Sequence, residues 1–377
     1  MDALQLACDL VAVPSISATT NQDAADIVLS ALQRDGFETE RLAYDDPNRV
    51  RKVCIVGRKG NGNGGLAYFA HTDVVPAESW SISAHGPFVP TVRDGKLYGR
   101  GSCDMKGSLA AFVAAAARVP AHELISPIYV IATADEEIGF HGARHVVDQS
   151  ELYRELVGGG ARALVGEPTE LQVVYAHKGG YGIRVTSRGR AAHSSTREGI
   201  NANLAMIPFL QEMKQIHDES MTDPRWLHQE FEPPWISWNI GINDHTAAVN
   251  ITPPQSVCTI AFRPMPGQDP ELLIERARRA AERQDLEFQV TWRLPPLYTD
   301  PDSPFIHELL ELTGTTRPHT VAFGTDGSIF SEIPRIAVCG PGSIRQAHTD
   351  DEWLSLEQLE RGVDLYQQGI RRWCTRN

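Results

Sequence analysis

Four separate stretches of this chain share one pattern, in which an apolar, strand-like run ends and an acidic or imidazole side chain follows. The runs are Leu66 to Ala70, Pro127 to Ala134, Ala163 to Val165 and Arg335 to Cys339. The side chains that follow them are His71 with Asp73, then Asp135-Glu136-Glu137, then Glu167, and finally His348 beyond Gly340-Pro-Gly342. In open α/β sheets, ligands bind outside the carboxyl ends of the strands. The pattern therefore predicts that these groups converge on one point and form a metal site.

Strand-like and helical segments alternate over the first part of the chain and again at its end, which is typical of an α/β sandwich. Strands are expected at residues 52–56, 66–70, 128–133 and 335–339, and helices at 23–36, 107–118 and 304–312. The glycine-rich run 59–65 joins the first two strands. We interpret it as a hairpin turn and not as a phosphate loop, because neither a Lys-Ser/Thr ending nor a helix start follows it.

The pattern changes from about residue 177 onward. Half-exposed strands are expected at 182–186 and 235–240, further strands at 256–262 and 286–292, and amphipathic helices at 201–215 and 270–283. Two helices on one face of a four-stranded antiparallel sheet make a small α+β unit. A chain of 377 residues also exceeds what one core usually holds. We therefore expect a discontinuous domain of residues 1–177 and 295–377, with residues 178–294 inserted as a second domain.

Charge and composition narrow the class of partner. The formal net charge of -13 argues against nucleic acid and anionic membranes. The sequence shows neither a basic leader at its start nor an apolar run of membrane-spanning length, so a cytoplasmic protein is expected. The six cysteines are scattered without a Cys-x-x-Cys pair, which indicates reduced thiols and not a structural zinc site.

Each candidate ligand also has an ordinary structural explanation when it is taken alone. Asp104 lies in a glycine-rich bend before a helix, where it could be an N-cap or could bridge two metal ions with its two oxygens. Glu136 and Glu137 could simply favour a helix start. Taken together, two histidines, three carboxylates and one spare glutamate suffice for two zinc ions that share a bridge and a water. The alternative, a set of unrelated caps and surface charges, requires several coincidences.

The neighbours of these residues carry less information. Asp73 follows His71 at the spacing of an outer partner that fixes the tautomer of a metal-bound histidine. His141 and His145 are four residues apart but lack the intervening glutamate of a His-Glu-x-x-His site, so we interpret them as helix-face residues. Asp135 receives no role.

Six motifs of the chain form a specific set: His71-Thr-Asp73, Gly99-Arg-Gly-Ser-Cys-Asp-Met-Lys-Gly107, Asp135-Glu-Glu137, Gly166-Glu-Pro-Thr169, Gly189-Arg-Ala-Ala-His193-Ser-Ser195 and Ala347-His348. Together they resemble the dinuclear zinc deacylase and exopeptidase family that contains acetylornithine deacetylase, succinyl-diaminopimelate desuccinylase and the glutamate carboxypeptidases. The resemblance covers essentially the whole chain. It implies a three-layer, zinc-exopeptidase-like catalytic domain and an inserted domain that serves for dimerisation or as a lid.

The resemblance also implies roles for the site residues. One zinc would be held by His71, Asp104 and Glu167, and the other by Asp104, Glu137 and His348, with Co²⁺ able to substitute. Asp73 would orient His71. Glu136 would be the general base for a hydroxide that bridges the two ions and attacks an amide. His193 would reach the active site of the partner subunit in a homodimer and stabilise the oxyanion.

The substrate is implied less directly. Arg263, Asn250 and Thr325 resemble substrate-contacting positions of the family, and Lys178 is the cation available for a second carboxylate. The segments 174–179 and 340–348 look more like acetylornithine deacetylases, whereas Gly324-Thr-Asp-Gly327 is similar to a turn of the desuccinylases. We expect N-acetylornithine deacetylation in arginine biosynthesis, with desuccinylation or dipeptide and carboxypeptidase cleavage as alternatives. A non-catalytic binding relative is disfavoured because every ligand position and Glu136 are filled.

Overall fold

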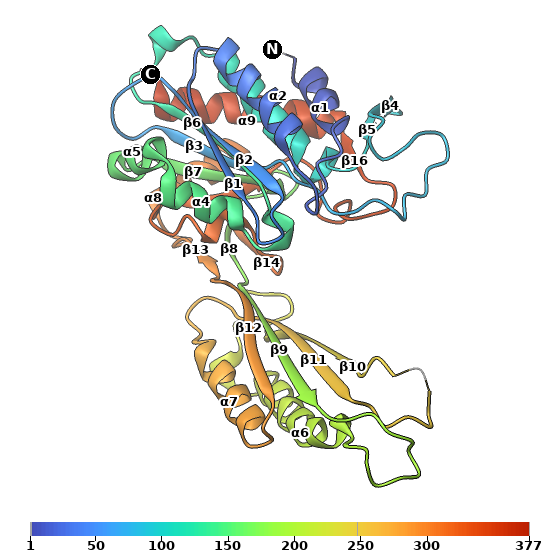
Figure 1. The fold of residues 1–377 in the computed structure, drawn as a ribbon. Helices are drawn as coiled ribbons and strands as arrows, with labels where there is room; N and C mark the ends of the chain where they lie inside the picture. The colour runs from blue at the N-terminus through green and yellow to red at the C-terminus, as the bar shows by residue number, and fades with distance from the viewer. Residues whose placement is uncertain (1, 247, 377) are drawn as a thin grey trace. The chain divides into compact units, whose positions relative to one another are not determined.

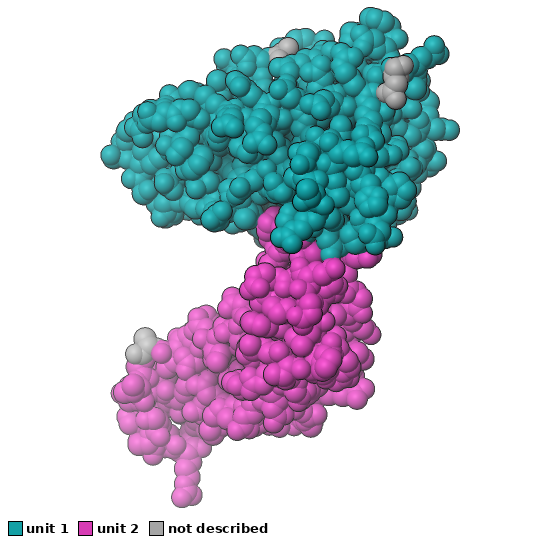
Figure 2. Space-filling model, turned by 180° about the vertical axis from the view of Figure 1, so that it is seen from behind, with its two compact units in different colours: residues 1–175, 299–319, 325–377 teal, residues 176–298, 320–324 magenta. Residues whose placement is uncertain are grey.

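The protein is described by a computed structural model in which residues 2–246 and 248–376 are placed. The chain forms two compact units, shown in different colours in Figure 2. Unit 1 comprises residues 1–175, 299–319 and 325–377, and unit 2 comprises residues 176–298 and 320–324. The expected domain borders at 177/178 and 294/295 lie within a few residues of these transitions. The sequence did not indicate that residues 320–324 group with unit 2.

The larger, mixed sheet has the strand order β1-β2-β6-β3-β7-β15-β8-β13, with β14 paired to β8. Its strands β1, β2, β6, β3, β7 and β15 belong to unit 1, whereas β13 belongs to unit 2. The strands are β1 (Glu38–Asp45), β2 (Arg51–Lys59), β3 (Leu66–His71), β6 (Ile128–Thr133), β7 (Arg162–Pro168), β8 (Val174–His177), β13 (Leu297–Tyr298), β14 (His319–Val321) and β15 (Ile336–Gly340). Strands β6, β3, β7 and β15 are parallel neighbours. Every residue of β3 and β6 is buried, as expected for central strands covered on both faces.

Helices cover both faces of this sheet, so unit 1 has the expected three layers (Figure 1). They are α1 (Ala3–Val11), α2 (Gln22–Arg34), α3 (Gly107–Ala117), α4 (His141–Gln149), α5 (Glu151–Gly159), α8 (Pro304–Thr313) and α9 (Leu356–Cys374). In Figure 1, α1, α2 and α9 lie above the sheet and α4 and α5 below it, while α8 contacts α9. A separate three-stranded sheet joins β4 (Thr91–Arg93), β5 (Lys96–Tyr98) and β16 (Trp353–Ser355).

The predicted hairpin over residues 59–65 is wrong. Strand β6 lies between β2 and β3, antiparallel to the first and parallel to the second. The glycine-rich run therefore leads from β2 past a strand that comes later in the sequence. The true hairpin joins β2 to β1, which the sequence analysis did not assign.

Unit 2 contains the expected α+β arrangement of one antiparallel sheet and two helices. Its strand order is β10 (Ser237–Asn243), β11 (Gln255–Arg263), β9 (Gly180–Arg188) and β12 (Glu287–Leu294). Helices α6 (Ala202–Ser220) and α7 (Glu271–Glu282) contact each other and pack on this sheet (Figure 1). Within residues 2–246 and 248–376, no helix is both long enough and apolar enough to cross a bilayer.

Candidate metal centre

The strand order of unit 1 brings together four segments that are distant in sequence, at the carboxyl ends of neighbouring strands. His71 is the last residue of β3, and Glu136 and Glu137 form a short 3₁₀ turn (Glu136–Ile138) that follows β6. Glu167 lies near the end of β7, and His348 lies in the loop after β15. Because these four strands are parallel neighbours, their carboxyl ends meet. The predicted convergence is therefore present in the structure.

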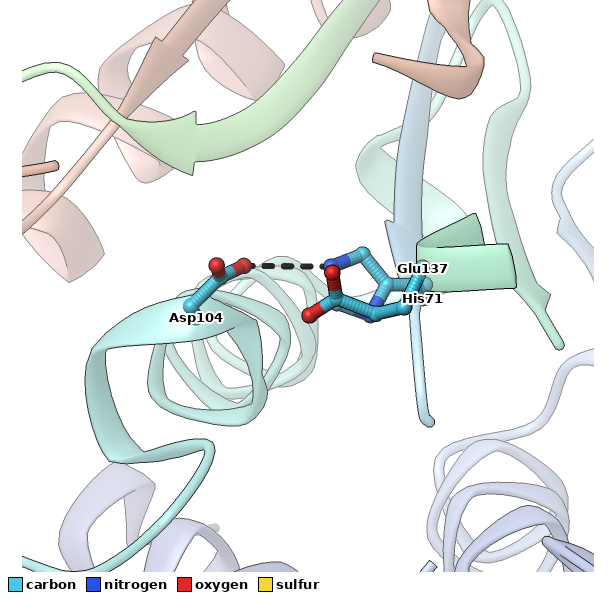
Figure 3. A group of neighbouring side chains, drawn as sticks. All are labelled: His71, Asp104 and Glu137. Atoms are coloured by element: carbon cyan, nitrogen blue, oxygen red, sulfur yellow. Dashed lines mark hydrogen bonds and ion pairs between the residues drawn. The ribbon is translucent and has the colours of Figure 1, made fainter. Parts of the chain in front are cut away.

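Asp104 lies between two imidazoles. It belongs to the tight turn Ser102–Lys106 that precedes α3, and its side chain faces His71 (Figure 3). Asp104 Oδ1 is 3.1 Å from His71 Nε2, and its Oδ2 is 3.2 Å from His348 Nε2. Each imidazole also faces one glutamate, with 3.6 Å from His71 Nε2 to Glu167 Oε1 and 3.1 Å from His348 Nε2 to Glu137 Oε1. The carboxylate of Asp104 thus presents one oxygen to each of two ligand groups.

The two sides of this cluster differ in their exposure to solvent. His71, Asp104 and Glu167 are almost fully enclosed, whereas the His348 side chain is 53% exposed. A water or substrate therefore has a route to the cluster from the His348 side.

Asp73 supports the cluster through both its main chain and its side chain. His71 Nδ1 is 2.9 Å from the carbonyl oxygen of Asp73, while the Asp73 carboxylate is 3.7 Å away. That carboxylate accepts hydrogen bonds from the main-chain N–H groups of Glu136 and Glu137 and from the Ser17 hydroxyl. The main-chain carbonyl, and not the side chain, is thus the nearest partner that can fix the His71 tautomer. The carboxylate instead ties the glutamate turn to the end of β3.

Asp135, which had no assigned role, has a structural partner. Its carboxylate is 2.7 Å from Lys52 Nζ, and both side chains are fully buried. It also accepts a hydrogen bond from the Tyr44 hydroxyl. Because removal of one partner would leave a buried charge uncompensated, this pair fixes the start of the glutamate turn. His145, on the helix that follows, packs its ring against Tyr44, in line with a helix-face residue.

Negative charge is in excess within the cluster. Burial raises the pKa of Glu136, Glu137 and Glu167, and neighbouring carboxylates act in the same direction. Although burial alone would raise the pKa of Asp104, hydrogen bonds with His348 and His71 hold it below the usual range. Four carboxylates share this space with two imidazoles, so with all four ionised an excess of negative charge would remain even if both imidazoles were protonated.

The neighbouring carboxylates raise the pKa of both imidazoles. Hydrogen bonds with Asp104 and Glu137 raise the pKa of His348 to about 10. Burial opposes the same effect at His71, but the Asp104 hydrogen bond and the charge of Glu167 raise its pKa well above the usual value.

The donor set fits divalent metal ions. The ligand atoms of His71, Asp104 and Glu137 lie within 4.8 Å of one another, and so do those of His71, Glu136 and Glu167. Imidazole nitrogens and carboxylate oxygens are ligands that zinc accepts in catalytic sites. Divalent cations would also neutralise the carboxylate excess, which protons on the imidazoles alone do not remove. The side chains therefore suit a metal centre by both chemistry and charge.

The remaining predicted residues lie elsewhere. His193 and Asn250 are exposed in unit 2 on adjoining loops, where the Ser194 N–H donates to the Asn250 carbonyl and His193 Nδ1 is 2.7 Å from Ser195 Oγ. Arg263 ends β11. Thr325 is buried in unit 1, and its hydroxyl oxygen accepts a hydrogen bond from the Gly327 N–H.

Lys178 differs from a free substrate-binding cation. It is fully buried in unit 2, and its ammonium donates hydrogen bonds to the carbonyls of Pro233 and Trp235 at 2.7 Å each. Burial, followed by the charge of Arg263, lowers its pKa to about 8. These contacts give Lys178 a structural function within unit 2.

Two buried carboxylates near the cluster were missed by the sequence analysis. Asp326 accepts a hydrogen bond from the Thr133 hydroxyl, and burial raises its pKa to about 6. Glu352 accepts hydrogen bonds from the segment that carries Asp104. The only sequence feature that drew attention to Asp326 was the turn Gly324-Thr-Asp-Gly327, which we associated with substrate. Glu352 follows Asp350 and Asp351, so it resembled part of an exposed acidic run.

Comparison with known proteins identifies the family. Residues 67–372 match the model of peptidase family M20/M25/M40. The chain belongs to this family. Acetylornithine deacetylase of Myxococcus xanthus is 32% identical over 97% of this chain and 96% of its own length. The enzyme of the same name from Proteus mirabilis (strain HI4320) is 30% identical over 98% and 96%.

Solved structures agree with the fold of this M20 family member. The YXEP protein of Bacillus subtilis, described as a dinuclear metal-binding peptidase, matches with a TM-score of 0.66 at 16% identity, over 98% of this chain and 97% of its own. The predicted family and fold class are confirmed, and the chain is a hydrolase of the M20 family.

Proposed function

We propose that this protein is a two-zinc amide hydrolase that removes the acetyl group from an N-acetyl amino acid, with N-acetylornithine as its substrate. His71, Asp104 and Glu167 would hold one ion, and Asp104, Glu137 and His348 the other. The observation that carries this proposal is the placement of the two Asp104 oxygens, at 3.1 Å and 3.2 Å from two different imidazoles. Co²⁺ would be accepted by the same ligands.

The chemistry divides between the metals and Glu136. Two bound divalent ions would acidify a water and polarise the amide carbonyl. Glu136 accepts the proton of that water and later delivers it to the departing amine. The Glu136 main-chain N–H donates to the Asp73 carboxylate, and a side-chain oxygen of Glu136 lies within 4.8 Å of donor atoms of His71 and Glu167, which places this carboxylate beside the ligand cluster.

The acetyl group is favoured on two grounds. The relatives that match over nearly their full length are named acetylornithine deacetylases. A succinyl group would bring a second carboxylate that needs a cation, and the ammonium of Lys178 is already engaged with two main-chain carbonyls. Arg263 would bind the substrate carboxylate through a bidentate guanidinium contact, with Asn250 and Thr325 as further contacts.

Desuccinylation of N-succinyl-diaminopimelate is the second candidate. The turn Gly324-Thr-Asp-Gly327 favours it, because it is similar to a turn of the desuccinylases and its Thr325 and Asp326 are buried, not loosely exposed.

A competitive turnover panel separates these functions. We expect kcat/KM to be highest for N-acetylornithine when the zinc- or cobalt-loaded enzyme is offered N-acetylornithine, N-succinyl-diaminopimelate, other N-acetyl amino acids and simple dipeptides. A preference for the succinyl substrate would select the second candidate. Equally slow turnover of all four classes would refute both assignments.

We also propose that the protein is a homodimer formed through unit 2, and that His193 acts in the active site of the partner subunit. Strand β10 lies at an edge of the unit 2 sheet, and an edge strand can pair with a second copy. Large apolar side chains are exposed on β10, on α6 and on the two loops that adjoin His193. They are Ile200, Leu204, Ile207, Ile242, Val249 and Ile251. An apolar area of this kind marks an interaction surface.

Replacing Ile242 with lysine is expected to produce monomers, because Ile242 lies on β10 and its side chain is 60% exposed. Sedimentation would then show a species near 41.5 kDa in place of one of twice that mass, and turnover would fall because His193 loses its partner. Leu272→Lys is the matched control, since Leu272 is 56% exposed in the same unit but lies on α7. A wild-type protein that sediments as a monomer would overturn the proposal.

A further inference from the structure

Glu352 is a fully buried carboxylate that lies outside the proposed ligand set. It stands directly before β16, and both of its oxygens are engaged. Oε1 accepts hydrogen bonds from the main-chain N–H groups of Cys103 at 2.9 Å and Asp104 at 3.0 Å. Oε2 accepts from the Gly101 N–H at 3.0 Å and from Arg100 Nη1 at 2.8 Å. One side chain thus binds four donors of a single short segment.

These contacts fix the main chain of Asp104. The turn that carries Asp104 has non-helical dihedral angles at Asp104 and Met105, and the main-chain hydrogen bond that closes it runs from the Lys106 N–H to the Gly101 carbonyl at 2.9 Å, without involving Asp104. The carboxylate of Glu352 supplies acceptors for N–H groups that would otherwise be buried without a partner. A fixed main chain at Asp104 fixes the origin of its side chain, whose two oxygens face His71 and His348.

The main chain of Glu352 also connects the segments that carry Asp104 and His348. His348 lies four residues before Glu352, and the Gly99 N–H donates to the Glu352 carbonyl at 3.1 Å. Strand β16 then pairs with β5, which leads directly into the Asp104 segment. Glu352 therefore holds the Asp104 turn against the start of the segment that presents His348.

We propose that Glu352 is a positioning residue of the metal centre, which sets the bridging geometry of Asp104 relative to His348. The inference rests on the proposed two-metal function. A neutral amide at this position can accept with its oxygen but directs an NH₂ group at either the Cys103 and Asp104 pair of N–H donors or the Arg100 and Gly101 pair. Glu352→Gln should therefore displace the Asp104 turn while leaving every proposed ligand in the chain.

The test is zinc and cobalt titration of the full-length protein by calorimetry, together with the visible absorption spectrum of the cobalt form. We expect Glu352→Gln to bind at least one of the two ions about 10–100-fold more weakly, the loss typical for a group that orients a metal ligand. The cobalt spectrum should change, and kcat should fall by a similar factor with KM nearly unchanged.

Glu40→Gln is the matched control. Glu40, on β1, also directs one oxygen at two successive main-chain N–H groups, those of Glu151 and Leu152 at 3.0 Å and 3.1 Å, but it does so at the start of α5. The Glu40→Gln variant should lower the thermal unfolding temperature of the metal-free protein without changing the metal affinity or the cobalt spectrum.

The outcomes are distinct. Glu352→Gln with wild-type affinity for both ions and a wild-type cobalt spectrum would overturn the inference, and so would an equal loss of affinity in Glu40→Gln. Failure of the wild type to bind metal would instead refute the proposed function. If Glu352→Gln does not fold, Glu352→Asp keeps the charge opposite Arg100 but shortens the reach to the Asp104 turn. Unchanged metal binding in that variant would also overturn the inference.

Discussion

Replacing Glu136 with glutamine is expected to lower kcat by about 10²–10⁴-fold, the usual contribution of a positioned general base, while both metal ions stay bound. Glutamine keeps the shape of the side chain but can no longer accept a proton. The main-chain N–H of residue 136 would still bind the Asp73 carboxylate, so the turn should keep its conformation. The lower activity would therefore be caused by the loss of proton transfer, so kcat should fall with little change in KM.

Glu137→Gln is the matched control, because the two glutamates are adjacent but are given opposite roles. Glu137 Oε1 is 3.1 Å from His348 Nε2, so its replacement should weaken binding of one metal ion. Metal analysis and turnover measured on the same preparations separate the two effects. A Glu136→Gln protein that carries both ions and turns over at nearly the wild-type rate would contradict the assignment of the base.

Asp104→Asn is expected to leave fewer than two ions per chain and to lower turnover by more than the about 10–100-fold typical for loss of a residue that only orients a ligand. Asparagine retains a single oxygen, and its NH₂ group cannot bind a metal. The Asp104 carboxylate has one oxygen 3.1 Å from His71 Nε2 and the other 3.2 Å from His348 Nε2. In the asparagine variant, one of these two imidazoles would face the NH₂ group and lose its acceptor. Zinc content after gel filtration and kcat report the two effects independently.

Asp326→Asn provides the control for Asp104→Asn. Asp326 is also a buried carboxylate, and it accepts a hydrogen bond from the Thr133 hydroxyl, but it does not belong to the proposed ligand set. It should retain both ions. An Asp104→Asn protein that holds two ions as tightly as Asp326→Asn would show that Asp104 does not bridge them.

The central strands and part of the cluster could be predicted because they are marked by residues that are close together in the sequence. Strands β3 and β6 are continuous apolar runs, and a polar ligand directly after such a run must emerge at the sheet edge. His71, Glu136 and Glu137 were located by this reasoning alone. Asp104 required the additional observation of its glycine-rich bend, which the structure shows as a tight turn before α3.

The parts that could not be predicted depend on contacts between distant segments. The sequence of residues 59–65 is compatible with a hairpin, and only the insertion of β6 between β2 and β3 excludes it. Glu352 and Lys178 carry charges that usually lie at the surface, yet both are fully buried because each meets main-chain partners brought to it by the fold. Local patterns carry no information on such partners.

The number of zinc ions bound per chain is the most direct evidence for or against a two-metal centre in this protein. Calorimetric titration of the metal-free wild-type protein is predicted to give two zinc ions per chain. Elemental analysis of the purified, zinc-loaded protein should give the same number. X-ray absorption of the loaded protein should then show a second metal at about 3.5–4 Å from the first, as in other two-metal hydrolytic sites. Binding of one ion or none at saturating zinc would contradict the two-metal centre.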